Sequence, residues 1–245
     1  MTGPWLLPFS QSLCTLAAAT TGAGVAESAL PSAWWTILLA WLIGSTPFGF
    51  LAGKLKGIDI REHGSGNIGA TNVLRVLGKP IGITTLVLDV LKGLVPVIIT
   101  QQVVGPDNSL VPILAAVATI LGHNYTFWLG FKGGKGIATS AGAIAPLIPI
   151  PLAIALLLWG LSFAISRYVS IASIVAAVSL PVTAAIQAWR AGQWDWPLLI
   201  FTLFLAVMAT WRHRSNLKRL REGTESRFEP RKKREGASSS DESAS

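Results

Sequence analysis

Long apolar runs with almost no charge recur along this chain and constrain its fold more than any other feature. Each run is near the 20 residues that a helix needs to cross about 30 Å of hydrocarbon. The runs are residues 34–53, 81–104, 110–129, 171–189 and 196–211. Because backbone polar groups inside a bilayer must be paired within the protein, each run is expected to be helical. The sequence therefore predicts an all-α polytopic membrane protein with at least five spans.

Composition and charge support this fold class. Of the 245 residues, 51% are hydrophobic and only 13% are charged, which is too few charges for an ordinary soluble domain. The net charge is +8, but about half of the basic residues lie between residues 212 and 234, beside an apolar run. A membrane-facing cytoplasmic tail explains this cluster better than nucleic-acid binding, and we expect no nucleic-acid partner.

The sequence shows no pattern for a metal or a cofactor, and we expect neither. The three histidines and the single cysteine are too scattered for a zinc site. Gly64-x-Gly66-x-x-Gly69 has the spacing of the dinucleotide fingerprint, but its acidic partner, Asp89, falls inside an apolar run instead of on a second strand. The loop around Lys135 is not a Walker A motif, because Gly136 follows the lysine where that motif has Ser or Thr.

The positions of Lys and Arg predict the orientation. The first 53 residues contain neither, whereas residues 54–79 contain five. Placing the N-terminus outside puts these residues, Lys132, Lys135 and the tail on the cytoplasmic side. Residues 139–166 are too long for one straight span and contain three prolines, so a broken, re-entrant pair of short helices is expected there. The total is about seven transmembrane or re-entrant helices, with the N-terminus outside and the C-terminus cytoplasmic.

The chain divides into three parts by composition. Residues 1–32 carry no basic residue, unlike a cleaved signal peptide, and we interpret them as a variable N-terminal extension. Residues 33–226 form the integral-membrane domain. Residues 227–245, rich in Ser, Lys, Arg and Glu, are expected to be a disordered charged tail.

Three polar segments interrupt the apolar pattern on the predicted cytoplasmic side. Residues 64–75 offer glycines, amides, hydroxyls and one guanidinium, which suits an anionic group. Residues 130–139 place four glycines around two lysines at the start of a helix, as a phosphate cradle does. A basic turn that obeys the positive-inside rule is the alternative. In residues 211–220, His213 and Asn216 recur at helical spacing. Together the segments predict a phosphate-bearing substrate with a lipid or acyl partner.

Several polar residues have a structural reading as well as a functional one. Asp89 and Lys92 lie three positions apart on one helix face, so they either pair as a structural lock or face the polar cleft. Ser45, in a Gly- and Pro-containing stretch, marks either close helix packing or the border of the cleft. Ser166 and Ser170 are equally explained as helix caps.

The three polar segments resemble the signature blocks of the bacterial acyl-phosphate-dependent glycerol-3-phosphate acyltransferase family. They occur in the family's order, and the resemblance covers residues 34–226. It implies a seven-helix enzyme of the bacterial inner membrane with its site on the cytoplasmic side. Such an enzyme transfers a fatty acyl group from acyl phosphate to the 1-hydroxyl of sn-glycerol 3-phosphate. The products are lysophosphatidic acid and phosphate, in the first step of phospholipid biosynthesis.

The resemblance, carried over residue by residue, also gives the expected site. The residues expected to be catalytic are Ser65, Arg75, Lys135, His213 and Asn216. Those expected to bind substrate or phosphate are Asn67, Thr71, Asn72, Gly133, Gly134 and Ser170. The Gly133 and Gly134 amides are expected to donate to the oxyanion or to a phosphate oxygen. A substrate phosphate oxygen is the expected base, with His213 as the rival.

Two other functions have sequence features of their own. Acyltransferases that use acyl-CoA or acyl carrier protein commonly carry His-x-x-x-x-Asp, but Ile68, Trp128 and Lys218 stand five residues after the three histidines. A small membrane transporter or channel for phosphorylated anions is the alternative, since re-entrant helices also mark transport sites. The absence of a repeat between the two halves counts against it. The sequence leaves the acyl-chain length and the oligomeric state open, a monomer included.

Overall fold

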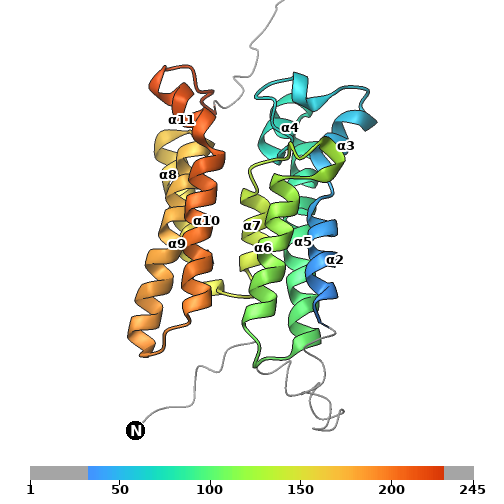
Figure 1. Cartoon of the computed structure of the whole chain (residues 1–245). Coiled ribbons are helices and arrows are strands. Elements are labelled where there is room, and N and C mark those ends of the chain that lie inside the picture. Colours follow the sequence, from blue (N-terminus) through green and yellow to red (C-terminus); the bar gives the residue numbers. More distant parts are fainter. Residues whose placement is uncertain (1–32, 229–245) are drawn as a thin grey trace, which may run out of the picture.

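A computed structural model describes residues 33–228, and this part of the chain is helical with no strand (Figure 1). Five segments within it are long and apolar enough to cross a membrane, and the bent pair α10 (Trp196–Arg212) and α11 (Arg214–Arg221) adds a sixth. The five are α2 (Trp35–Gly44) with α3 (Phe48–Leu55), α5 (Lys79–Val104), α6 (Leu110–Asn124) with the 3₁₀ turn Phe127–Leu129, α8 (Pro149–Ser166) and α9 (Val169–Ala191). The predicted all-α polytopic fold is confirmed. The predicted extension, 1–32, and the tail from residue 229 lie outside the described residues.

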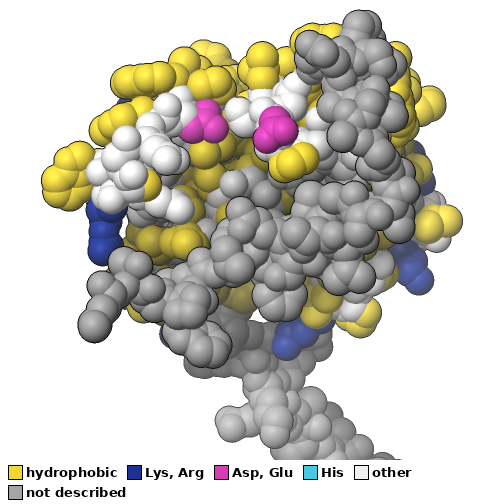
Figure 2. Space-filling model, turned by 90° about the horizontal axis from the view of Figure 1, so that it is seen from below, with side chains coloured by type: hydrophobic (Ala, Val, Ile, Leu, Met, Phe, Trp, Pro, Cys, Tyr) yellow, Lys and Arg dark blue, Asp and Glu magenta, His cyan; other side chains and the backbone are white. Residues whose placement is uncertain are grey.

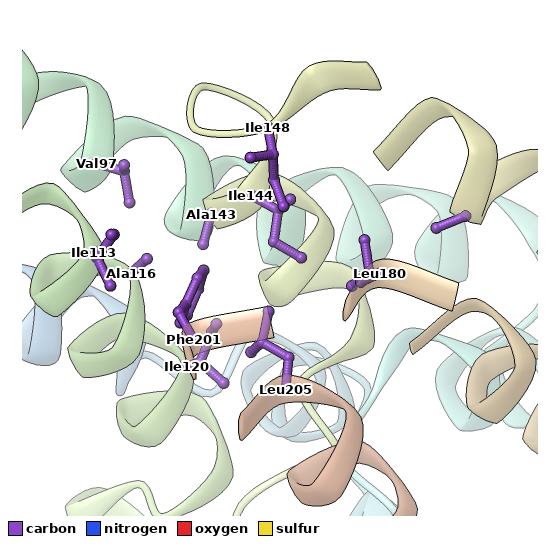
Figure 3. Packing of buried hydrophobic residues seen from close by; sticks show 11 residues of the cluster. Val97, Ile113, Ala116, Ile120, Ala143, Ile144, Ile148, Leu180, Phe201 and Leu205 are labelled. Atoms are coloured by element: carbon purple, nitrogen blue, oxygen red, sulfur yellow. The ribbon is translucent and has the colours of Figure 1, made fainter. Parts of the chain in front are cut away.

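The helices form two groups, with α2, α5, α6 and α7 (Ile137–Ile144) in one and α8, α9 and α10 in the other (Figure 1). A cluster of buried apolar side chains joins the groups. Phe201 and Leu205 of α10 pack there with Ile120 of α6 and Ile144 of α7 (Figure 3). Burial of such side chains stabilises the bundle because dense packing gives each many dispersion contacts.

The first span is broken where the sequence places its proline. Helix α2 ends at Gly44 and α3 starts at Phe48, after Pro47. A Cβ on Gly44 would lie less than 3.0 Å from the backbone of Thr119, so the glycine lets α2 approach α6 closely. Ser45 is fully buried, and its Oγ donates to the Trp41 carbonyl at 2.8 Å. This geometry favours the packing interpretation of Ser45.

The segment 139–166 reverses as predicted, but only its first helix is short. The eight residues of α7 extend about 12 Å, and the chain then turns at residues 145–148 and returns along α8 to the end of the bundle where α7 began (Figure 1). Helix α8 has 18 residues and is itself a candidate span, so the prediction of two short helices is wrong for α8. Proline fits its first turn, because the amides there have no partner within the helix.

The two ends of the bundle differ in charge. Where the described side chains are visible from below, acidic ones lie among apolar and uncharged ones, and basic side chains show at the edge of the view (Figure 2). The turns after α5 and α9 contain Asp107 and Asp195. The opposite end carries the basic segment 54–79, the loop 130–136 and the basic helix α11.

The packed region extends slightly past the predicted boundary at residue 226. The Phe228 amide donates to the Arg167 carbonyl at 2.9 Å, and its ring meets the Phe163 ring edge-on at 5.6 Å. Phe228 therefore belongs to the packed domain, although the sequence analysis placed it in the tail.

Candidate active site

A cavity of about 240 Å³ lies between the loop before α4 (Ala70–Leu77), the loop before α7, and the end of α10 with α11. All three polar segments line it. The lining residues are Ser65, Gly66, Asn67, Gly133, Lys135, Arg212, Arg214, Ser215 and Arg219. Four of them are cationic, and they come from segments almost 80 residues apart. The fold thus brings the three segments to one place, as the sequence analysis expected.

The loop before α7 is held by its own peptide groups. The Gly133 amide donates to the Asn124 carbonyl at 3.2 Å, and the Gly134 amide donates to the His123 carbonyl at 3.1 Å. The Arg212 guanidinium donates to the Gly133 carbonyl at 2.9 Å and to the Gly134 carbonyl. Both amides are thus paired inside the protein, and their predicted contact with an oxyanion or phosphate stays a prediction. In this structure, these peptide groups hold the loop that carries Lys135.

A chain of hydrogen bonds links Lys135 to a carboxylate. Its Nζ donates to Asn216 Oδ1, and Asn216 Nδ2 donates to Glu225 Oε1 at 2.5 Å. Ser170 Oγ donates to the same oxygen at 3.1 Å, while Arg219 Nε donates to Glu225 Oε2 at 2.8 Å. The carboxylate therefore links α9, α11 and the loop at residues 130–136, called here the Gly/Lys loop. Ser170 does not cap α9; it reaches the site through Glu225.

Glu225 reaches this position because the chain reverses after α11. Gly223 has a φ of 70°, the left-handed conformation that commonly ends helices, and the Thr224 amide then donates to the Arg219 carbonyl at 2.8 Å. Burial alone would raise the pKa of Glu225, but hydrogen bonds from Asn216 and Arg219 outweigh it, and its pKa is lowered. The residue is therefore an anion at neutral pH.

The Lys135 ammonium lies in an environment that weakens its charge. Its pKa is lowered to about 8, chiefly by burial and also by the charges of Arg219, Arg212 and Arg75, while the charge of Glu225 opposes the change. A cation crowded by other cations gains when a dianion enters the cavity. Arg75 therefore acts on Lys135 electrostatically, although it is exposed and is not among the described residues that line the cavity.

The first polar segment contributes both to the lining and to the framework. Asn67 lines the cavity, and its Oδ1 accepts from the Gly69 amide at 2.8 Å where α4 starts. Asn72 is buried: its Oδ1 accepts from the Ser65 amide at 2.8 Å, and its Nδ2 donates to the carbonyls of Ile60 and His63 at 3.2 and 3.0 Å. The side chain thus holds the loop that carries Ser65, and its predicted contact with substrate stays a prediction. The same applies to Thr71, which is not among the described lining residues.

His213 is buried between α10 and α11. Its Nδ1 lies 2.8 Å from the Ala209 carbonyl, which assigns the proton to Nδ1 and leaves Nε2 as the acceptor. Burial, and then the Lys135 charge, lower the pKa of His213 to about 4. The imidazole is neutral at pH 7 and a weak base in this state.

Sequence reasoning missed the lining residues Gly66, Arg214, Ser215 and Arg219, and also two residues that organise the site, Arg212 and Glu225. Both stand inside the third polar segment or just after it. The available signals were weak: Arg212 directly precedes His213, and Glu225 is an acid that follows a strongly basic helix. Arg212 meets Gly133 and Gly134, 79 and 78 residues away, and Glu225 meets Ser170, 55 residues away, which local composition does not reveal.

Comparisons with known proteins show the family. The family model described as glycerol-3-phosphate acyltransferase matches residues 34–223. The glycerol-3-phosphate acyltransferase of Desulforamulus reducens is 48% identical over 190 residues, covering 77% of this chain and 92% of the relative. That of Geobacter sulfurreducens is 47% identical over 193 residues, covering 78% and 94%.

Solved structures give the same result. The crystal structure of PlsY (YgiH), an integral membrane glycerol 3-phosphate acyltransferase in its glycerol 3-phosphate form, matches with a TM-score of 0.74 and 40% identity, covering 81% of this chain and 96% of that one. Its lysophosphatidic acid form matches with a TM-score of 0.72 and 39% identity. This chain belongs to the glycerol-3-phosphate acyltransferase family.

Proposed function

We propose that this enzyme transfers a fatty acyl group from acyl phosphate to the 1-hydroxyl of sn-glycerol 3-phosphate, giving lysophosphatidic acid and phosphate. One observation carries the proposal: Lys135, Arg212, Arg214 and Arg219 line a single cavity at one end of a membrane bundle. Names and bound forms of the relatives support glycerol 3-phosphate as acceptor. Acyl phosphate as donor rests on the sequence resemblance and on the cationic lining.

The chemistry needs little covalent help from the protein. Acyl phosphate is a mixed anhydride with a good leaving group, so attack by the 1-hydroxyl requires no acyl-serine intermediate. The enzyme must hold two phosphorylated molecules together and aim the hydroxyl at the carbonyl carbon. Arg75 and Lys135 offset the phosphate charges. With the Gly133 and Gly134 amides already paired, the Lys135 ammonium is the donor that stabilises the developing oxyanion.

A phosphate oxygen of the substrate accepts the proton of the attacking hydroxyl. The lowered pKa of His213 supports this assignment, because a group with a pKa of about 4 is a weak base at neutral pH. We expect His213→Gln to retain kcat within about tenfold, since loss of a general base costs more, about 10²- to 10⁴-fold. Steady-state kinetics at saturating substrate tests this. Abolished turnover with an unchanged KM would assign the base to His213.

The Lys135 pKa of about 8 predicts an alkaline limb in the pH profile. The ammonium that offsets phosphate charge is present below this pH and is lost as the pH rises through it, so kcat/KM should fall above about pH 8. Because kcat/KM reports the free enzyme, the limb reflects the empty cavity. In Lys135→Arg the limb should disappear up to about pH 10, because arginine stays protonated. An unchanged limb in that variant would assign the titration to another group.

We propose further that the enzyme resides in the bacterial inner membrane with the cavity on the cytoplasmic side. The basic residues gathered at the cavity end and the acidic turns at the other support this orientation (Figure 2). In a Cys14→Ser background, an impermeant thiol reagent should label Asn108→Cys in intact cells and Lys79→Cys only after permeabilisation. The reverse pattern would invert the topology.

The reaction itself is tested by incubating the detergent-purified protein with palmitoyl phosphate and labelled glycerol 3-phosphate. Lysophosphatidic acid should form, and palmitoyl-CoA in parallel should give none. A transporter of phosphorylated anions would form no product with either donor. Product from palmitoyl-CoA alone would leave the glycerol 3-phosphate site standing and overturn the choice of donor.

A further inference from the structure

A cluster of buried polar groups lies outside the cavity, on α5 and on α6, the helix that precedes the Gly/Lys loop. It contains Asp89 and Lys92 of α5 and His123 of α6, each no more than 4% exposed. Burying such groups at membrane depth is costly, so a cluster of this kind implies a function beyond packing. None of the three is among the described residues that line the cavity, and none has a part in the chemistry proposed above.

His123 contacts the loop in two ways. Its carbonyl accepts the Gly134 amide at 3.1 Å. Its imidazole also lies directly against Gly134, because a Cβ added to that glycine would come within 3.0 Å of the ring atoms Nε2 and Cε1. Glycine at this position leaves room for the ring, and the ring in turn limits where the next residue, Lys135, can lie.

The other side of the ring faces an ion pair. His123 Nδ1 lies 3.8 Å from Asp89 Oδ1, and Asp89 Oδ1 pairs with Lys92 Nζ at 2.7 Å. Lys92 Nζ also donates to the Thr46 carbonyl at 2.7 Å, at the break between α2 and α3, where helical partners are missing. The ion pair is therefore also bound to the α2–α3 span, which limits movement of the side chains that pack against the His123 ring.

We propose that His123 is a positioning residue whose ring, backed by Asp89 and Lys92, seats the Gly133–Lys135 loop so that Lys135 meets Asn216. The ring acts through the loop and does not touch substrate. The two interpretations of Asp89 and Lys92 then combine, since the pair is a structural lock that serves the site. The inference rests on the proposed role of Lys135.

A double-mutant cycle with a matched control tests the positioning role of His123. Gly134→Ala should lower kcat/KM about 100-fold, because its Cβ displaces the loop from the ring and a shift of about 1 Å can cost that much. His123→Ala should lower it about tenfold. In the His123→Ala background, Gly134→Ala should cost less than threefold, because the ring that it would strike is gone. In a His123→Asn background, Gly134→Ala should likewise lower kcat/KM less than threefold.

Gly133→Ala is the matched control, because its Cβ would strike the His123 carbonyl oxygen and not the ring. Its loss should therefore be equal in both backgrounds. Two results would contradict the positioning role of His123. One is an equal loss of kcat/KM for Gly134→Ala in both backgrounds, and the other is a His123→Ala variant with wild-type activity. Thermal unfolding in detergent shows that each variant is folded. If the wild-type protein makes no lysophosphatidic acid, the proposed function is wrong. If it makes the product but the effects of His123→Ala and Gly134→Ala are additive, only the positioning role of His123 is wrong.

Discussion

Lys135→Ala is expected to lower kcat/KM for glycerol 3-phosphate about 100- to 1000-fold while the protein remains folded. The residue lines the cavity, donates to Asn216, and is the cation most deeply placed among the three converging segments. Removing one preorganised donor from a developing oxyanion has a cost of this size. Because its partly buried charge is not compensated by a close ion pair, its loss should not lower the thermal midpoint.

Lys132→Ala is the control for this prediction. It removes the same charge from the same loop, but Lys132 is exposed and is not among the described lining residues. Its activity should stay within about threefold of wild type, because an exposed charge is strongly screened. Comparable losses in both variants would mean that the loop contributes only general positive charge, and a near-wild-type Lys135→Ala would contradict the assigned role.

Glu225→Ala should lower kcat/KM about 100-fold and reduce the thermal midpoint as well. The carboxylate accepts from Ser170, Asn216 and Arg219, and its removal leaves their donors without a partner. A hydrogen bond to a charged group contributes about 1.5–3 kcal/mol, so the loss of this set is expected to exceed that of a neutral pair. Without Glu225, Asn216 is free to rotate away from Lys135.

Glu222→Gln serves as the matched control because Glu222 also lies near the end of α11. It is exposed and faces Lys218 at 3.8 Å, a surface pair that contributes little. We expect unchanged activity and an unchanged thermal midpoint. Glu225→Gln, which keeps the shape but removes the charge, should fall between wild type and Glu225→Ala. If Glu225→Ala kept full activity, the hydrogen-bonded chain would have no catalytic importance.

Much of the fold could be predicted because its signals are local. Apolar runs of span length act on neighbouring residues, and the structure confirms the helices that they predict; the α2–α3 break likewise lies at a proline, Pro47. The length of α8 was misjudged because Pro149 and Pro151 fall in its first turn, where proline does not end a helix.

The site was predictable only in its residue types. Glycines and lysines in the loop before α7 predicted an anion site, and Gly133 and Lys135 do line the cavity, but whether a given amide is free depends on tertiary partners. The amides of Gly133 and Gly134 are occupied by α6, which no local pattern shows. The side-chain amide of Asn72 likewise donates to carbonyls in the loop that precedes it, those of Ile60 and His63. Glu225 acquires its role only once a left-handed glycine turns it back towards α9 and α11.

The most direct measurement is an experimental structure of this protein with glycerol 3-phosphate bound. The phosphate should lie in the cavity with an oxygen within about 3 Å of Lys135 Nζ, the distance of a charge-assisted hydrogen bond. The 1-hydroxyl should point towards the space left for the acyl donor. A phosphate held at the opposite end of the bundle, or one with no contact to the Gly/Lys loop, would contradict the convergence of the three polar segments on the substrate.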